Sequence, residues 1–253
     1  MSSSARAWVL NLDAEHELEA QAHYVPTQAL RAIVARERVR LIGSLVGPDD
    51  VVLTEEALVG VGSAAERARG LPGFAWSPTP RALALLRACG AAPVLAPSLE
   101  ILRTVNARPF AARVREPLAC ESFAKHVLST FEEVSAHLAL PAQDGWLVRR
   151  TFGAAGRGRR RIAAGQPSPA ERAWITASLR RGPLVIEPWV RVTREYTRSA
   201  WVHAGGKITI SPPCFQRTTE QGAWTLTQRA QRGDVSREDD ERFLLVSGGE
   251  LGS

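Results

Sequence analysis

The chain has 253 residues and a mass of 27.5 kDa, and 45% of its residues are hydrophobic and 23% are charged. A chain of this size and composition can bury about three quarters of the surface that it exposes when unfolded, which excludes a disordered protein. No apolar run approaches the ~20 residues of a membrane helix, and the N-terminus lacks the apolar stretch of a secretory signal. We therefore expect a globular protein of the cytoplasm.

Basic residues concentrate in the middle of the chain. The net charge is +6, but residues 105–213 hold 17 basic and 8 acidic residues, a net charge of +9. Such a concentration indicates an anionic partner: a nucleotide, a peptide carboxylate or a nucleic acid. Because nearly all of the basic residues are arginines and alanine and glycine are also abundant, the arginine excess by itself indicates only the codon usage of a high-GC genome.

The three cysteines and five histidines are scattered. There is no CxxC motif and no disulfide framework, because neighbouring cysteines are about thirty or more residues apart. The histidines show no ligand spacing, and none lies beside a cysteine that could act as a nucleophile. The sequence therefore predicts no metal site and no catalytic residue of these kinds.

The first hundred residues predict a small α/β unit. The expected elements are a strand at 7–13, an exposed Glu-rich loop at 15–19, a helix at 26–36, a strand at 50–54 and a helix at 79–89. The last of these has the strongest signals, because Thr79 is an N-cap residue, Pro80 takes the first helical position and Gly90 lies just past the end. Alternating strands and helices are typical of an α/β unit.

The middle of the chain predicts helices and then a hairpin. Two short helices that meet near Asn106 are expected over 98–115. Strands at 146–151 and 159–162 enclose the Gly-rich segment 152–158, which indicates a hairpin with a wide tip.

Further elements follow. A capping box at 168–171 begins a helix that runs to about residue 179, and residues 183–187 read as a short buried strand. Beyond residue 195 the pattern turns to β. The expected elements there are strands at 196–203 and 207–211 around a Gly205-Gly206 turn, a strand at 224–229, and a helix that a capping box at 236–239 begins.

A Gly-rich hairpin tip, a group of arginines and a short apolar strand ending in Glu187-Pro-Trp-Val190 make up the candidate site. Glycines let the backbone approach a phosphate, and consecutive N–H groups can form an anion-binding nest. Arginine adds bidentate donors for phosphate or carboxylate. The alternative is a surface hairpin whose glycines serve only the turn. The arginines are Arg149, Arg150, Arg157, Arg159, Arg160 and Arg161.

The order and spacing of residues 146–162, segment 184–190 and Glu195 resemble the nucleotide-binding middle of the ATP-grasp superfamily. Members of that family carry a phosphate-binding lysine on a strand, a Gly-rich flap, a helix and a Glu-x-x-Val hinge that reads adenine. The resemblance implies an α/β (α+β) fold, with a pre-ATP-grasp α/β unit over 1–104 and a truncated ATP-grasp-like region with an antiparallel sheet over 105–253.

The resemblance also implies roles for single residues. Glu187 matches the hinge acid, and Trp189 and Val190 match the backbone that faces the base. Glu195 stands where a ribose-facing carboxylate is found, and Arg149 stands at the lysine position. The nucleotide- or ligand-binding candidates are Arg149, Gly153, Gly156 and Gly158 of the flap, Glu187, Trp189, Val190, Glu195, and Arg108 of the helix that resembles the entry segment.

Two departures from the family pattern affect catalysis. Arginine differs from lysine in geometry, so Arg149 is not an equivalent phosphate ligand. The family binds Mg²⁺ through an acid on one strand and a Glu-x-Asn on the next, whereas the asparagines here are Asn11 and Asn106, both upstream. The acidic run at 238–241 reads as a solvated helix face. The sequence therefore predicts no catalytic residue, no metal and no cofactor, and the initial Met favours a naturally short form over a fragment.

A phosphate-binding pattern of glycines and arginines without metal ligands predicts a non-catalytic binding protein. The chain resembles the truncated ATP-grasp-like proteins that bind peptides in ribosomal-peptide natural-product pathways such as that of crocagin. This resemblance implies a precursor peptide or another anionic peptide as partner, added as a strand to the β-edges of residues 195–229. A homodimer is expected, because losing the final strands of such a fold exposes a sheet edge.

Two other functions stay open. An ATP-dependent carboxylate–amine ligase that forms an acyl phosphate would hold ATP with Arg149, Glu187 and Glu195, and Mg²⁺ with further residues. A nucleic-acid binder would use the arginines of 149–161, but Phe152 is the one aromatic residue within that segment, so stacking support is thin. We expect no membrane partner.

Overall fold

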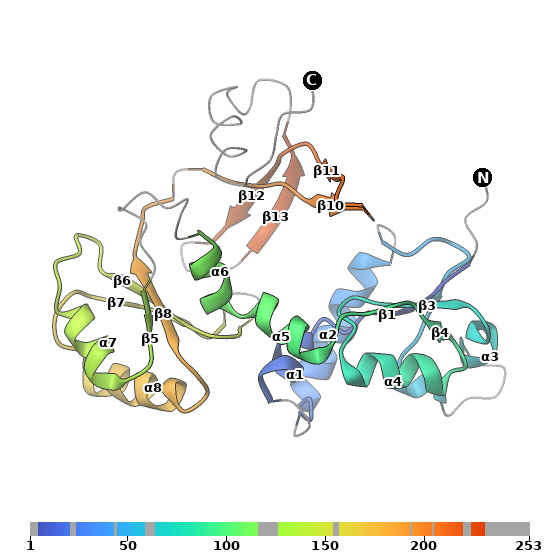
Figure 1. The fold of residues 1–253 in the computed structure, drawn as a ribbon, viewed down its shortest axis with the longest axis horizontal. Coiled ribbons are helices and arrows are strands. Elements are labelled where there is room, and N and C mark those ends of the chain that lie inside the picture. The colour runs from blue at the N-terminus through green and yellow to red at the C-terminus, as the bar shows by residue number, and fades with distance from the viewer. Residues whose placement is uncertain are drawn as a thin grey trace. The chain divides into compact units, whose positions relative to one another are not determined.

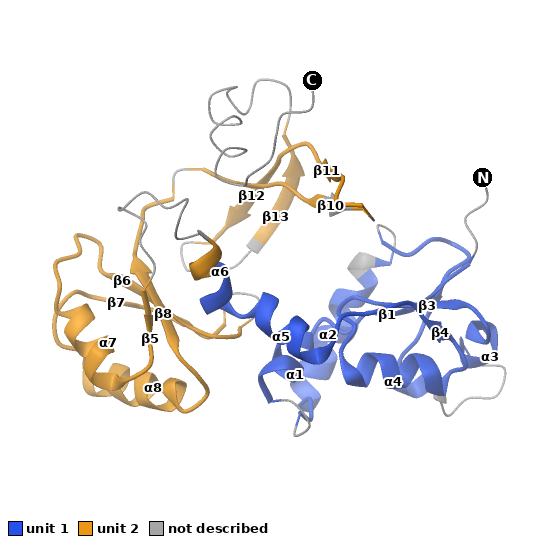
Figure 2. Ribbon diagram, in the orientation of Figure 1, with its two compact units in different colours: residues 1–111 blue, residues 112–253 orange. Residues whose placement is uncertain are grey.

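The computed structural model forms two compact units, residues 1–111 and 112–253 (Figure 2). The sequence placed this boundary between residues 104 and 105. None of the helices in the described part of the chain combines the length and the apolarity needed to span a bilayer. The described residues are 5–20, 24–42, 45–58, 64–115, 126–153, 157–192, 194–203, 205–219 and 224–230.

The first unit contains a parallel four-stranded sheet, sheet A, with the strand order β2-β1-β3-β4 (Figure 1). Its strands are β1 (Ala7–Val9), β2 (Val51–Val52), β3 (Pro72–Ala75) and β4 (Ala92–Pro93). The helices are α1 (Ala14–Ala20), α2 (Gln28–Leu41), the 3-10 helix η2 (Glu55–Leu58), α3 (Ala64–Ala68), α4 (Pro80–Ala88), α5 (Leu99–Asn106) and α6 (Arg108–Arg115), which crosses the unit boundary. The predicted α/β unit, helix α4 and the pair α5–α6 are confirmed.

Alternating side chains of β1 build a core on each face of sheet A. Ala7 and Val9 pack with Leu86 of α4 in one cluster, whereas Trp8 and Leu10 pack with Val46 in another. Parallel sheets are normally covered on both faces, so their strands are apolar throughout. This explains why the run after residue 6 shows no clean alternation of polar and apolar residues.

The predicted exposed loop at residues 15–19 is wrong, because these residues lie in helix α1. Glu17 is buried, and its carboxylate accepts hydrogen bonds from the Thr79 hydroxyl at 2.7 Å and from the Arg81 backbone N–H at 3.0 Å. Both donors belong to the N-terminus of α4. The Glu-rich pattern suggested exposure, but one of its acids serves as an anionic cap for another helix.

The second unit contains an antiparallel four-stranded sheet, sheet B, with the order β5-β8-β6-β7. Figure 1 shows two helices on one of its faces, and their apolar side chains share a core with Trp146, Val148 and Ile186 of the sheet. The predicted hairpin, helix and buried strand are confirmed. The elements are β5 (His126–Leu128), α7 (Phe131–Leu138), β6 (Trp146–Arg150), β7 (Arg159–Ile162), α8 (Pro169–Leu179) and β8 (Leu184–Pro188).

The remaining strands form two small antiparallel sheets. Sheet C has the order β13-β12-β9, and β10 pairs with β11 across a turn in which Gly205 and Gly206 have positive φ. The single strand predicted over 196–203 is wrong, because the chain passes from one sheet to another within it. The helix expected from residue 236 lies outside the described residues. The strands are β9 (Glu195–Thr197), β10 (Ala200–Val202), β11 (Ile208–Ile210), β12 (Cys214–Thr218) and β13 (Trp224–Arg229).

Both helices on sheet B begin with a capping box, and that of α8 allows a stability test. Ser168 Oγ accepts from the Glu171 N–H at 3.3 Å, and Glu171 Oε2 accepts from the Ser168 N–H at 2.7 Å. Ser168→Ala should lower the free energy of unfolding by about 1 kcal/mol, because the Glu171 N–H loses its acceptor and the Glu171 carboxylate loses the hydrogen bond from Ser168 Oγ. Urea denaturation measures this, with the exposed mid-helix Thr176→Ala as control; equal midpoints for the two variants would show that the cap contributes nothing.

Candidate functional site

The arginines of the β6–β7 hairpin divide between the two faces of sheet B. Side chains alternate along a strand, so Arg150 and Arg160 lie on the helix-covered face. Each guanidinium lies 5.4 Å from the ring centroid of Trp174 in α8, and Arg150 Nε donates to Ser178 Oγ at 2.9 Å. Trp174 thus lies against both guanidiniums, and the two arginines help to hold α8 against the sheet.

On the opposite face, the structure brings together two residues that the sequence singled out separately. Arg149 of β6 and Glu187 of β8 form an ion pair with Nη2 and Oε1 2.5 Å apart, and their side chains are 31% and 13% exposed. The register places Leu147 opposite Glu187 and Arg149 opposite Val185, so the charged pair is diagonal. In this partly desolvated setting the attraction is stronger than in water. The charge of Arg149 is therefore balanced by that of Glu187.

The hinge segment after β8 is tied to neighbouring parts of sheet B. The Trp189 N–H donates to Gly145 O at 2.8 Å, which extends the strand pairing by one bond. The Arg161 guanidinium lies 5.0 Å from the centroid of the Trp189 ring, and Arg161 Nε donates to Asp144 O at 2.8 Å. Val190, the other hinge candidate, is exposed.

Two cavities flank the loop at residues 141–145 beside this hinge. One of about 330 Å³ lies between that loop and residues 188–191, and one of about 530 Å³ is lined by the loop, Arg161 and residues 163–164. The smaller volume is near the lower end for small-molecule pockets. Trp189 and Arg161 line different cavities, so their contact lies between the two.

Aromatic support for the hairpin arginines comes from outside the hairpin, which corrects the sequence reasoning. Phe152 is buried, whereas Trp174 and Trp189 are the rings that contact these guanidiniums. Both lie more than ten residues from the hairpin in the sequence, so proximity along the chain could not reveal them. Strand alternation predicts which arginines share a face, but it does not predict the ring that each one meets.

The flap glycines have unequal roles. Gly158 has φ +70°, and a Cβ there would lie 3.1 Å from Phe152 O, so the turn itself requires glycine. Its carbonyl accepts from the Arg150 N–H at 2.8 Å, which closes the hairpin. Gly153 lies at the edge of the described residues, and Gly156 lies outside them.

Glu195 and Arg108 are not joined to this site by strand pairing. Glu195 lies on β9 of sheet C, where it is opposite Gln216 and its Oε2 accepts from the Thr218 hydroxyl at 3.2 Å. Arg108 begins α6 and belongs to the first unit. The structure thus groups Arg149, Glu187, Trp189 and Val190 on sheet B. In the described ranges, no three His, Cys, Asp or Glu side chains gather as a metal site.

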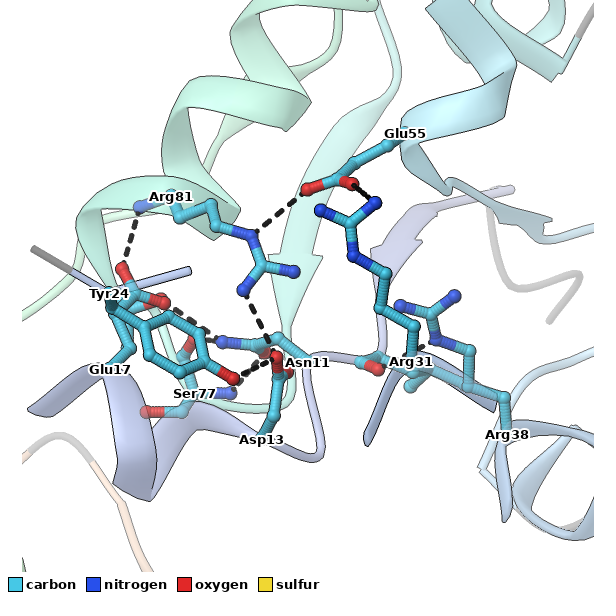
Figure 3. A network of polar contacts seen from close by, with 11 residues as sticks. Asn11, Asp13, Glu17, Tyr24, Arg31, Arg38, Glu55, Ser77 and Arg81 are labelled. Atoms are coloured by element: carbon cyan, nitrogen blue, oxygen red, sulfur yellow. Dashed lines mark hydrogen bonds and ion pairs between the residues drawn. The ribbon is translucent and has the colours of Figure 1, made fainter. Parts of the chain in front are cut away.

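A second polar cluster, which the sequence did not predict, lies in the first unit at the carboxyl ends of the sheet A strands. Figure 3 shows Asn11 and Asp13, which follow β1, close to Ser77 and Arg81, which follow β3. Asn11 Nδ2 donates to Ser77 O at 2.8 Å. Arg81 also binds Glu55 Oε1, which follows β2, at 3.1 Å. Parallel sheets bring the carboxyl ends of their strands to one edge. The polar residues that follow each predicted strand could therefore have indicated this cluster from the sequence.

Asp13 is the centre of this cluster. Its Oδ2 accepts from the Tyr24 hydroxyl at 2.7 Å and from Arg81 Nη1 at 3.0 Å, while Oδ1 is buried and has no hydrogen-bond partner in the described structure. Burial alone would raise the pKa of Asp13, but the hydrogen bonds from Tyr24 and Arg81 and the charge of Arg81 lower it below its ordinary value. Burial and Asp13 together raise the pKa of Tyr24. The cluster therefore holds a charged carboxylate inside the unit.

Comparisons with known proteins identify the fold. No family model matches the chain, and no curated protein matches its sequence. Among solved structures, N5-carboxyaminoimidazole synthetase from Staphylococcus aureus complexed with ADP aligns with a TM-score of 0.53 and 10% identity over 98% of this chain. D-alanyl-alanine synthetase A from Vibrio cholerae aligns with a TM-score of 0.51 and 13% identity, covering 97% of this chain and 80% of its own.

The chain spans 64% of the length of the staphylococcal synthetase. Identities this low establish the fold alone, and both synthetases belong to the ATP-grasp superfamily. The shared features are a parallel sheet followed by antiparallel sheets, as the resemblance of residues 146–195 implied. The chain therefore has an ATP-grasp-like fold.

Proposed function

We propose that this protein is a non-catalytic, peptide-binding member of the proteins with an ATP-grasp-like fold. The observation that carries the proposal is the ion pair between Arg149 and Glu187. These residues stand where the ATP-grasp pattern has its phosphate lysine and its hinge acid. Each is engaged by the other, so a nucleotide phosphate would have to compete with a carboxylate held on the adjacent strand.

The donor set therefore fits a nucleotide poorly. Separating Arg149 from Glu187 would leave a carboxylate that is only 13% exposed without its cation, which is costly. The planar guanidinium of arginine also differs from the compact ammonium that the family pattern uses. At the hinge, the Trp189 N–H is engaged with Gly145 O. We derive no reaction step through ATP or Mg²⁺ from these residues.

The positive charge of the middle of the chain supports an anionic partner. Residues 105–213 carry a net charge of +9, and Arg160 and Arg161 are exposed. An acidic peptide complements such a surface, and strand-rich folds recognise extended peptides through backbone hydrogen bonds. Following the resemblance to truncated peptide-binding relatives, we propose a precursor peptide of a ribosomal-peptide pathway as the partner. We also propose a cytoplasmic location and a homodimer, which sedimentation equilibrium tests.

The likeness to two synthetases favours one competing function, an ATP-dependent carboxylate–amine ligase. Isothermal titration calorimetry with MgATP separates the two functions. We expect no binding heat up to about 1 mM MgATP with the full chain, because Arg149 is already neutralised. The staphylococcal synthetase serves as positive control. Micromolar, Mg²⁺-dependent binding would overturn the non-catalytic proposal and favour the ligase.

A further inference from the structure

Strand β7 is an edge of sheet B. It pairs with β6 on one side, and the strand order of the described sheet ends with it. Edge strands offer a row of backbone donors and acceptors to another chain. Charged side chains usually protect such an edge, and β7 contains three arginines in succession, at residues 159–161.

The pairing register shows which backbone groups of β7 point away from β6. The Arg150 N–H donates to Gly158 O, directly opposite, so this pair is of the hydrogen-bonded kind. Hydrogen-bonded and non-hydrogen-bonded pairs alternate along an antiparallel ladder. Arg160 therefore bonds to β6 through its backbone, whereas Arg161 directs its N–H and C=O outward.

The side chains of β7 place positive charge on both faces of this edge. Arg160 lies on the helix face beside Trp174 and is exposed. Arg161 lies on the opposite face, and its side chain is 51% exposed although it also contacts Asp144. The cavity of about 530 Å³ that Arg161 lines opens beside the end of the strand. An added strand would meet guanidinium groups above and below its backbone.

We propose that β7 is the binding site for an extended acidic peptide, which adds to sheet B as a fifth strand. Consecutive carboxylates of the peptide alternate between the two faces and meet Arg160 on one face and Arg161 on the other. A side chain of the peptide enters the cavity at the end of β7. This inference rests on the proposed function and replaces the edges at residues 195–229 as the site of strand addition.

Charge selects this occupant over a second copy of the chain. Two β7 strands paired antiparallel about Arg160 would place arginine opposite arginine at residues 159–161, and like charges opposite each other are destabilising. If an acidic peptide strand takes the place of the second copy, each of these like-charge pairs becomes an attractive pair of opposite charges. Screening by salt must weaken such binding, because both guanidiniums are exposed to solvent.

Fluorescence anisotropy of the full chain with a labelled peptide, Thr-Val-Glu-Glu-Glu-Val-Thr, tests the proposal. We expect saturable binding that weakens from 50 to 500 mM NaCl and is absent for the peptide with lysines in place of the glutamates. Arg160→Gln combined with Arg161→Gln should weaken binding at least about tenfold. The control is Arg36→Gln combined with Arg180→Gln, which removes two exposed arginines from other elements and should change binding less than about twofold.

Backbone methylation separates strand addition from charge attraction. Two peptides carry N-methyl groups on alternate sets of residues, so only one set blocks amides that face β7. One peptide should lose binding and the other should retain it within about twofold. Equal binding by both, or loss by both, overturns strand addition.

The remaining outcomes are distinguishable from failure of the proposed function. If the chain binds the peptide but the Arg160/Arg161 double variant binds equally well, β7 is not the site and peptide binding stands. If neither this peptide nor a library of acidic peptides binds, both proposals fail, and the arginines only protect the edge. A full-length variant in which the acids at residues 238–241 are replaced by the corresponding amides should bind the peptide as tightly as the parent does. If this variant binds the peptide at least about tenfold more tightly, the chain's own acidic segment competes for β7, and the proposal of a separate peptide as its occupant is overturned.

Discussion

Replacing Gly145 with alanine is expected to lower the free energy of unfolding by about 3 kcal/mol or more. Gly145 has φ +82°, which costs other residues about 1–2 kcal/mol. A Cβ there would lie 2.6 Å from Ile162 O and 3.2 Å from Ala163 Cα, and both of these are backbone atoms that cannot rotate away. Relieving that clash costs a further 1–3 kcal/mol or so.

The effect should extend to the candidate site, because the Gly145 carbonyl accepts from the Trp189 N–H and the residue lines both cavities. Guanidinium denaturation measures the loss of stability, and Trp189 fluorescence in a variant in which the other six tryptophans are replaced reports the hinge. Gly70→Ala is the matched control, since Gly70 has φ +76° and a Cβ added there would have nothing within 4 Å. Similar losses of stability in both variants would mean that the clash with Ile162 contributes nothing and that the positive φ alone accounts for the loss.

Replacing Arg81 with methionine should destabilise the first unit by about 3 kcal/mol at pH 7. Asp13 is almost fully buried, and Arg81 Nη1 is its charged partner at 3.0 Å. Removing one partner of a buried pair leaves an uncompensated charge, which typically costs about 3–5 kcal/mol. Arg81 also contacts Glu55 and lies 5.5 Å from the centroid of the Tyr24 ring, so these contacts are lost as well.

The pH dependence identifies Asp13 as the cause. In the parent protein the pKa of Asp13 is lowered, so its contribution to stability is present above about pH 4 and is lost as the pH falls through the folded-state pKa. Without Arg81, only the Tyr24 and backbone hydrogen bonds oppose the effect of burial, so the pKa of Asp13 is higher than in the parent and the variant gains less stability as the pH rises. Its deficit should therefore be larger at pH 7 than at pH 3.

Thermal unfolding of Arg81→Met at both pH values measures this difference. The control is Arg36→Met, which breaks an exposed ion pair with Glu37 and should cost less than about 1 kcal/mol at either pH. Adding Asp13→Asn to Arg81→Met should recover part of the stability at pH 7. A deficit independent of pH and unchanged by this second substitution would assign the loss to packing rather than to charge.

Local signals predicted several elements well. Helix α4 follows from Thr79, Pro80 and Gly90, and helix α8 from its capping box, because caps act within a single turn. The same signal was missed at Thr130 and Glu133, which begin α7 with a complete capping box. Short strands such as β3 and β4 were missed because two to four residues carry too little periodicity.

The sequence alone determined the ATP-grasp-like fold class and the group of residues on sheet B, because order, spacing and caps are properties of neighbouring residues. Only the tertiary structure decided how those residues are used. Arg149 neutralises Glu187 across two strands, and Glu17 caps a helix more than sixty residues away. Such contacts depend on strand register and on burial, which determine the partner of each charge. Both arise from residues far apart in the sequence, so no local segment of the chain predicts them.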